Sequence, residues 1–170
     1  MKKRILSILC VLLMMVSTSV AAFADESNVV AYMTVPATAI DVSVTESIDM
    51  TGSANSVDLI VDKVTITNNG TAGVINIDKV TATAATGWSF VDATTNFKLL
   101  NANAKKLSLT STLGSSTWDI IKTCPTFAKV ESSVAAGASK NITFTGKTGV
   151  VTTAVNHEQA ASIVVTLSLI

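Results

Sequence analysis

The sequence predicts an all-β protein built as a sandwich or barrel. After residue 24 the chain contains 23 Thr and 18 Val, which are β-branched residues that favour strands. Several short runs alternate apolar and polar residues, and clusters of turn residues separate them. Helix signals are poor, and 154–161 is the better of two short candidates. Many short strands between turns are typical of a sandwich or barrel.

The first 24 residues have the order of a secretory signal peptide. Lys2-Lys3-Arg4 is a basic start, 5–16 is almost wholly apolar, and Ala22-Phe23-Ala24 is a small-x-small exit. We expect cleavage after Ala24, which leaves 25–170 as a single secreted or extracellular domain with no membrane segment. The alternative is an uncleaved anchor, because the apolar stretch is close to the roughly 20 residues that span a bilayer.

The charge balance argues against a nucleic-acid partner. Three of the 12 Lys and Arg residues lie in the leader, so nine remain against 12 acidic residues, a net charge of −3. No Arg and no basic cluster remains, so the electrostatic footprint of a nucleic-acid or membrane-surface binder is absent from the sequence. Cys124 is the one cysteine after the leader and cannot form an intrachain disulfide, so we expect a small buried side chain.

The alternation changes parity at two similar places. After Asp62-Lys63 and again after Asp78-Lys79, the apolar residues move to the other face of the predicted strand. Each change needs an extra residue, so we expect a bulge, or a bend from one sheet to the other, there. Between them lies Asn69-Gly70, a strong signal for a type I′ turn. The pattern therefore predicts a β-hairpin over 57–84.

Further strands are expected downstream. We predict short strands at 97–100 and 106–110, with Leu107 and Leu109 facing the core. The last strand is clear, because Ile163, Val165, Leu167 and Leu169 alternate with Val164, Thr166, Ser168 and Ile170.

Three segments resemble bacterial extracellular Ig-like modules of the Gram-positive type. The strand and turn Val64–Gly70 is similar to their opening strand, and Gly87-Trp88-Ser89-Phe90 is similar to their Gly-Trp strand. Ala136–Phe144 resembles their small-Gly-x-Ser turn and late strand. The resemblance implies an antiparallel, Ig-like β-sandwich that serves as a spacer, adhesin or fibre component, and it carries over no functional residues.

The residues of acid–base, nucleophilic and metal chemistry are sparse. His157 is the only histidine, and no second His or Cys cluster could complete a zinc site. No Gly-x-Ser-x-Gly elbow is present, although a triad of residues distant in sequence stays open. We therefore assign no catalytic, cofactor-binding or metal residue, expect no cofactor, and interpret His157 as a surface or loop residue.

Aromatic side chains are the remaining candidates for ligand contact. Seven follow the leader, and core packing explains most of them, including Trp88. Tyr32 and Trp118 are the best candidates for exposed ligand contacts.

Three functions are compatible with the sequence. The first is a non-catalytic structural or adhesive module at the cell surface, the second is a carbohydrate- or cell-wall-binding module, and the third is a small secreted hydrolase. The expected partner is a cell-wall or surface component, or other copies of the chain by strand pairing. Strand pairing is an option because 29–35 and 163–170 are uncharged and β-prone.

The first prediction concerns processing. The small-x-small exit predicts that the mature protein begins at Asp25. The intact mass of the secreted protein measures this directly. A mass that retains residues 1–24 would contradict cleavage and favour the anchor.

Overall fold

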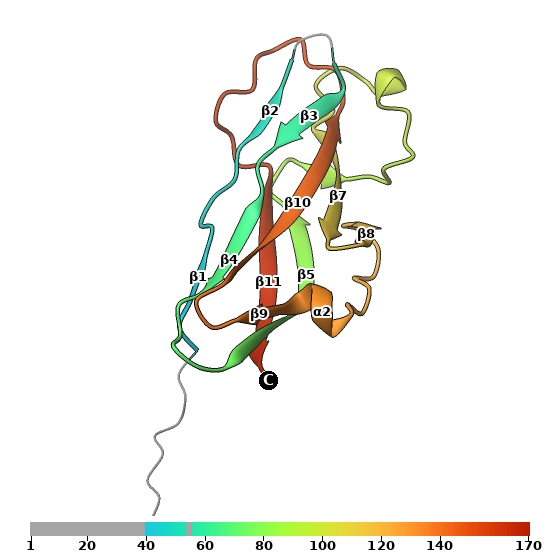
Figure 1. Ribbon diagram of the computed structural model, residues 1–170. Helices are drawn as coiled ribbons and strands as arrows, with labels where there is room; N and C mark the ends of the chain where they lie inside the picture. Colours follow the sequence, from blue (N-terminus) through green and yellow to red (C-terminus); the bar gives the residue numbers. More distant parts are fainter. Residues whose placement is uncertain (1–39, 54–55) are drawn as a thin grey trace, which may run out of the picture. The chain divides into compact units, whose positions relative to one another are not determined.

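The computed structural model describes residues 40–53 and 56–170, and it is all-β, with two antiparallel sheets packed together as a sandwich (Figure 1). The elements in chain order are β1 (Val42–Val44), β2 (Met50–Gly52), β3 (Asp58–Val61), β4 (Val64–Asn68), β5 (Val74–Ala84), β6 (Ser89–Phe90), the 3-10 helix η1 (Phe97–Leu99), β7 (Lys106–Leu113), β8 (Ser116–Asp119), α2 (Lys129–Ser132), β9 (Ser133–Ala135), β10 (Ser139–Thr148) and β11 (Ala161–Leu169). The expected signal peptide, Tyr32 and the run 29–35 lie outside the described residues.

The larger sheet is built around β10. One side of β10 pairs first with β4 and then with β3, and its other side pairs with β7. β1 continues the sheet beyond β4, β2 continues it beyond β3, and β6 and β8 both pair with β7. Every pairing is antiparallel except the two-residue pairing of β6 with β7.

The first parity change is confirmed as a break between two strands, but the chain stays in the larger sheet and does not bend from one sheet to the other. β3 ends at Val61 and β4 begins at Val64, so Asp62-Lys63 separates two strands that both pair with β10. The break lets Val64 and Ile66 face the core, where they are 4% and 0% exposed.

The second parity change is confirmed as a bulge in the smaller sheet, which has the order β11–β5–β9. Thr166 pairs with Lys79 and Leu167 with Ile77, so Asp78 is the extra residue. Its insertion keeps both Ile77 and Val80 in the core, at 0% and 1% exposure. The predicted alternation of β11 is confirmed from 163 to 167, where the odd-numbered side chains are more buried than those at 164 and 166. It is not confirmed at Leu169, which is 41% exposed beside the half-buried Ser168.

The predicted hairpin over 57–84 is wrong. β4 pairs with β1 and β10, whereas β5 pairs with β11 and β9, so the turn between them crosses from one sheet to the other. Neither Asn69 nor Gly70 has a positive φ, and Gly73 (φ 88°) does. The Asn69 side chain instead donates to Ser43 Oγ at 2.7 Å, which holds the turn against β1.

Asn68, at the end of β4, fixes this crossing. Its side chain is 2% exposed, and Nδ2 donates to the carbonyl of Val134 (3.1 Å) and to that of Gly73 (3.3 Å). Its Oδ1 accepts from the Gly70 N–H at 3.1 Å. One buried carboxamide therefore connects the larger sheet, the crossing turn and β9 of the smaller sheet.

Two other local expectations are corrected. Residues 97–99 form the helix η1 and not a strand, because the Asn96 side chain accepts from the Lys98 N–H and caps a helical turn. The segment 154–160 is irregular where a short helix was the candidate. In contrast, β7 is confirmed, with Leu107 and Leu109 at 1% and 0% exposure.

The second prediction tests the role of Asn68. Asn68→Ala leaves the Val134 carbonyl without this donor in a buried site, so we expect a loss of about 1–3 kcal/mol in the free energy of unfolding. Urea denaturation measures the loss, and Asn69→Ala is the matched control because the Asn69 side chain is exposed. Equal effects of the two substitutions would contradict the assignment.

Candidate functional site

Trp118 is a core residue, which corrects the expectation that it is exposed. It is 7% exposed on β8, and its ring centroid lies 5.2 Å from that of Phe127 with the planes tilted by 54°. The segment after β8 turns back over the smaller sheet, where the Val80 N–H donates to Cys124 Sγ at 3.4 Å. This covering segment buries the indole and leaves Cys124 half-buried, so Cys124 is less enclosed than expected.

Trp88, which the sequence predicted to lie in the core, lies at the boundary between the core and the surface. It is half-buried and packs against the core, and its Nε1 donates to Glu158 Oε1 at 3.1 Å. The preceding Gly87 has φ 85°, a left-handed conformation that glycine adopts without a steric cost. Glycine therefore allows the turn that places Trp88 between the core and the surface.

Glu158 is the centre of a small polar cluster with Trp88 and Lys105. Lys105 Nζ lies 2.6 Å from the same Glu158 Oε1 and 5.9 Å from the Trp88 ring centroid. The hydrogen bond from Lys105, and then that from Trp88, lowers the pKa of the Glu158 carboxyl. The carboxylate is thus held in its charged form by a cation and an indole N–H.

The loops that carry this cluster contain unusual backbone conformations. Asn103, Lys105 and His157 are the non-glycine residues of the described chain with positive φ, at 62°, 48° and 47°. Asn103 also joins the two loops, since its Oδ1 accepts from the Thr152 N–H (2.8 Å) and its Nδ2 donates to Thr152 Oγ1 (2.6 Å). His157 is an exposed loop residue, as the sequence predicted.

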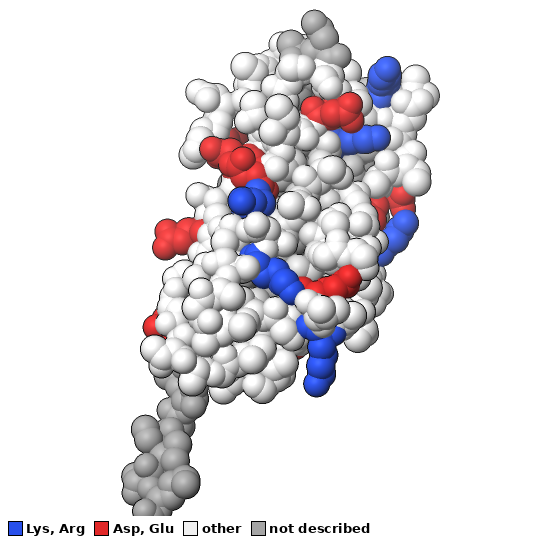
Figure 2. Space-filling model, in the orientation of Figure 1, with Lys and Arg blue, Asp and Glu red and all other residues white. Residues whose placement is uncertain are grey.

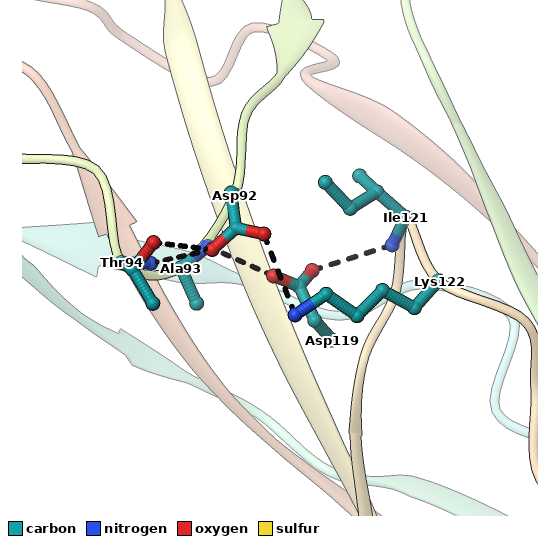
Figure 3. A network of polar contacts seen from close by, with 6 residues as sticks. All are labelled: Asp92, Ala93, Thr94, Asp119, Ile121 and Lys122. Atoms are coloured by element: carbon teal, nitrogen blue, oxygen red, sulfur yellow. Dashed lines mark hydrogen bonds and ion pairs between the residues drawn. The ribbon is translucent and has the colours of Figure 1, made fainter.

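A second polar network is centred on Asp119, the last residue of β8 (Figure 3). Asp119 is 7% exposed, and its carboxylate accepts from the backbone N–H of Ala93 (2.8 Å) and of Ile121 (3.3 Å). Backbone donors satisfy this buried charge, and the network joins the loop after β6 to the end of β8.

Asp92 belongs to the same network (Figure 3). Its carboxylate accepts from the N–H and the hydroxyl of Thr94, at 2.9 and 2.7 Å, and lies 3.4 Å from Lys122 Nζ. The hydrogen bonds from Thr94 are the main cause of the lowered pKa of Asp92. Asp92 is therefore a loop-stabilising carboxylate.

Glu131 forms a third junction, between α2 and the β7–β8 turn. Its carboxylate accepts from the Ser115 N–H (2.8 Å), the Ser115 hydroxyl and the Ser116 hydroxyl (3.1 Å). These bonds, with those from Ser115 the largest, lower the pKa of Glu131. Gly114, which has φ 60°, leaves room for the Glu131 side chain.

The outer face of the larger sheet has a shallow hollow of about 430 Å³. The lining residues are Asp58, Leu59, Ala93, Ser108, Thr110, Thr145, Gly146 and Lys147. One carboxylate, one amine and several hydroxyls line the hollow, and none of its lining residues is a histidine or cysteine. Across residues 40–53 and 56–170, no group of three or more His, Cys, Asp or Glu side chains could hold a metal ion.

Comparison with known proteins assigns this chain to no family, so its classification is the fold that the structure shows. No family model, curated protein or solved structure matches this chain. The two packed antiparallel sheets are established, whereas the Ig-like topology stays a prediction. In the part of the chain that the structure describes, no helix is long and apolar enough to cross a membrane.

Sequence reasoning did not find the cluster around Glu158. Trp88 and Glu158 are 70 positions apart, and Lys105 and Glu158 are 53 apart, so no local spacing indicates their contact. The only local signals were Gly87 before Trp88 and the adjacent ionisable pair His157-Glu158.

The third prediction concerns the pH dependence of this cluster. Because the folded-state pKa of Glu158 is lowered, its contribution to stability is present above the unfolded pKa and is lost as the pH falls through the folded value. Protonation removes the charge that holds Lys105 and weakens the hydrogen bond from the Trp88 N–H, so we expect a tryptophan fluorescence transition with a midpoint below the usual glutamate value of about 4.3. Glu158→Gln should abolish the transition. A transition that persists in Trp88→Phe would assign the signal to Trp118 and contradict the prediction.

Proposed function

We propose that this chain is an exported, non-catalytic β-sandwich that acts as a structural or adhesive module at the cell surface. The expected leader supports export, and the resemblance to extracellular Ig-like modules supports a surface role. The observation that carries the proposal is the use of the carboxylates: Glu158, Asp119 and Glu131 each join separate loops or elements of the sandwich. These carboxylates stabilise the domain's connections and are not gathered on one cavity.

The surface charge supports a protein or cell-wall partner over a polyanion. Figure 2 shows acidic and basic side chains interspersed on the visible face, several of them side by side, with uncharged surface between these groups. This face therefore has no single-sign field that would attract nucleic acid. The proposed partner is a cell-wall or surface component, or another copy of the chain.

A carbohydrate-binding module is the second candidate, and Trp88 is the observation that favours it. A half-buried indole beside Glu158 and Lys105 combines an apolar ring with hydrogen-bonding groups, which are the elements of a sugar subsite. The third candidate, a small secreted hydrolase, depends on His157.

The fourth prediction separates these functions. The processed protein is incubated with purified cell walls and, separately, with soluble glycans. We expect the protein to be recovered with the cell walls, without release of soluble products. Trp88→Ala should leave this distribution unchanged, with circular dichroism as the control for folding. Saturable glycan binding that is lost in folded Trp88→Ala would replace the proposal with a carbohydrate-binding module. Product release that is abolished by His157→Ala would replace it with a hydrolase.

A further inference from the structure

We propose that the outer edge of β11 binds an extended segment of a second copy of this chain, residues 29–35, as an added strand. The inference rests on the proposed structural role and names the partner for it. Within the described residues, β11 forms one edge of the smaller sheet and pairs only with β5.

The backbone of β11 presents a regular row of free groups on that edge. The Ala160 carbonyl accepts from the Ala85 N–H, and the Ile170 N–H donates to the Val74 carbonyl, so even-numbered residues face β5. Antiparallel strands alternate in this respect, so the odd-numbered residues of 161–169 direct their N–H and C=O groups away from β5. Among the described residues, none of these backbone groups has another hydrogen-bond partner.

The edge carries none of the usual protection against strand addition. β11 is nine residues long, and none of them is charged or a proline. The outer strands β1, β2 and β8 of the larger sheet are shorter, with three, three and four residues. Soluble proteins normally guard an edge of this length with Lys, Pro, a bulge or a covering loop. The bulge of this sheet lies on β5, at Asp78, and leaves β11 continuous.

The core under β11 is also incompletely covered. Ile163, Val165 and Leu167 alternate towards the interior but are only half-buried. On the neighbouring β5, Ile75 and Ile77 are 1% and 0% exposed. A strand added beside β11 would cover the side chains that the three-stranded sheet leaves partly open.

The sequence of 29–35, Val-Val-Ala-Tyr-Met-Thr-Val, fits such a strand. It is uncharged, and it lies between the acidic pair Asp25-Glu26 and Pro36. One face of an extended segment would be wholly apolar, with Val29, Ala31, Met33 and Val35. The other face would carry Val30, Tyr32 and Thr34. Thr34 is the one polar residue of the run, so the segment suits a largely covered strand whose wholly apolar face lies on the core.

Chain direction favours a second copy over the chain's own segment. β1 begins at the end of the sandwich where β11 finishes (Figure 1). At that end Val42 of β1 pairs with Asn68, whose side chain bonds to Val134. Val134 and Leu169 of β11 both pair with Ile75. The chain must reach this end before β1 starts. Its own 29–35 could then run along β11 only in the parallel direction.

A segment from another copy has no such constraint. It can pair antiparallel, as β5 does with β11, and antiparallel pairing is slightly more stable per residue than parallel pairing. Because donor segment and acceptor edge are different surfaces of one chain, repetition of the contact builds an open chain of copies unless two copies exchange segments reciprocally.

The fifth prediction uses the processed protein at several concentrations, with light scattering and residue-resolved hydrogen exchange. We expect assemblies larger than a monomer, with exchange of the Ile163, Val165 and Leu167 amides at least tenfold slower on assembly. The Val164 and Thr166 amides, which face β5, should be protected at all concentrations.

The matched variants change the two faces of the donor segment. Ala31→Lys with Met33→Glu should give a monomer with fast-exchanging odd-numbered amides, and a peptide of residues 28–36 should restore their protection. Val30→Lys with Thr34→Glu alters the opposite face and should still assemble. A protein that stays monomeric at all concentrations would overturn the proposal, whether or not its odd-numbered amides are protected. Assembly that persists in Ala31→Lys with Met33→Glu would overturn it as well. Saturable glycan binding that is lost in folded Trp88→Ala would overturn the proposed structural function without affecting these readouts.

Discussion

The buried carboxamide of Asn68 is the interaction on which the two-sheet arrangement depends. The chain leaves the larger sheet at the end of β4 and enters the smaller sheet at Val74, and both the turn and β9 must be held at this crossing. A side chain with both a donor and an acceptor can satisfy a turn N–H and a strand carbonyl at once, which an apolar residue cannot. The backbone adds to this junction, because the Asn68 carbonyl accepts from Gly137 and its N–H donates to Ala138.

The two parity changes show how far alternation alone can predict a fold. Both Asp-Lys pairs were identified as irregularities from the sequence, and both are irregular in the structure. They differ in kind, because β3 and β4 pair with successive parts of the long β10, whereas β5 stays paired with one strand on either side of Asp78. The sequence therefore locates the extra residue, and the partner strand decides between a break and a bulge.

The errors of sequence reasoning share a physical cause, which is that contacts distant in sequence overrode local preferences. Asn69-Gly70 favours a hairpin, but β4 and β5 each find partners in separate sheets, and Asn69 bonds to Ser43. Trp118 was predicted to be exposed because nothing near it in the sequence indicates that the segment ending at Phe127 covers it. The Glu158 cluster was unpredictable for the same reason, since three separate loops bring its members together.

The loops and the outer edge of β11 differ in the kind of contact that they offer. Loops are joined by specific charged contacts, such as Glu158 with Lys105 and Asp119 with Ala93, which leave those groups fully engaged. β11 differs from these loops. Its outward-facing backbone groups form a regular row, its side chains carry no charge, and among the described residues these backbone groups have no hydrogen-bond partner. A surface that binds through backbone groups selects an extended, apolar segment by shape and alternation more than by charge. Residues 29–35 have an apolar, β-prone sequence, so the proposed self-association would need no partner of different chemistry.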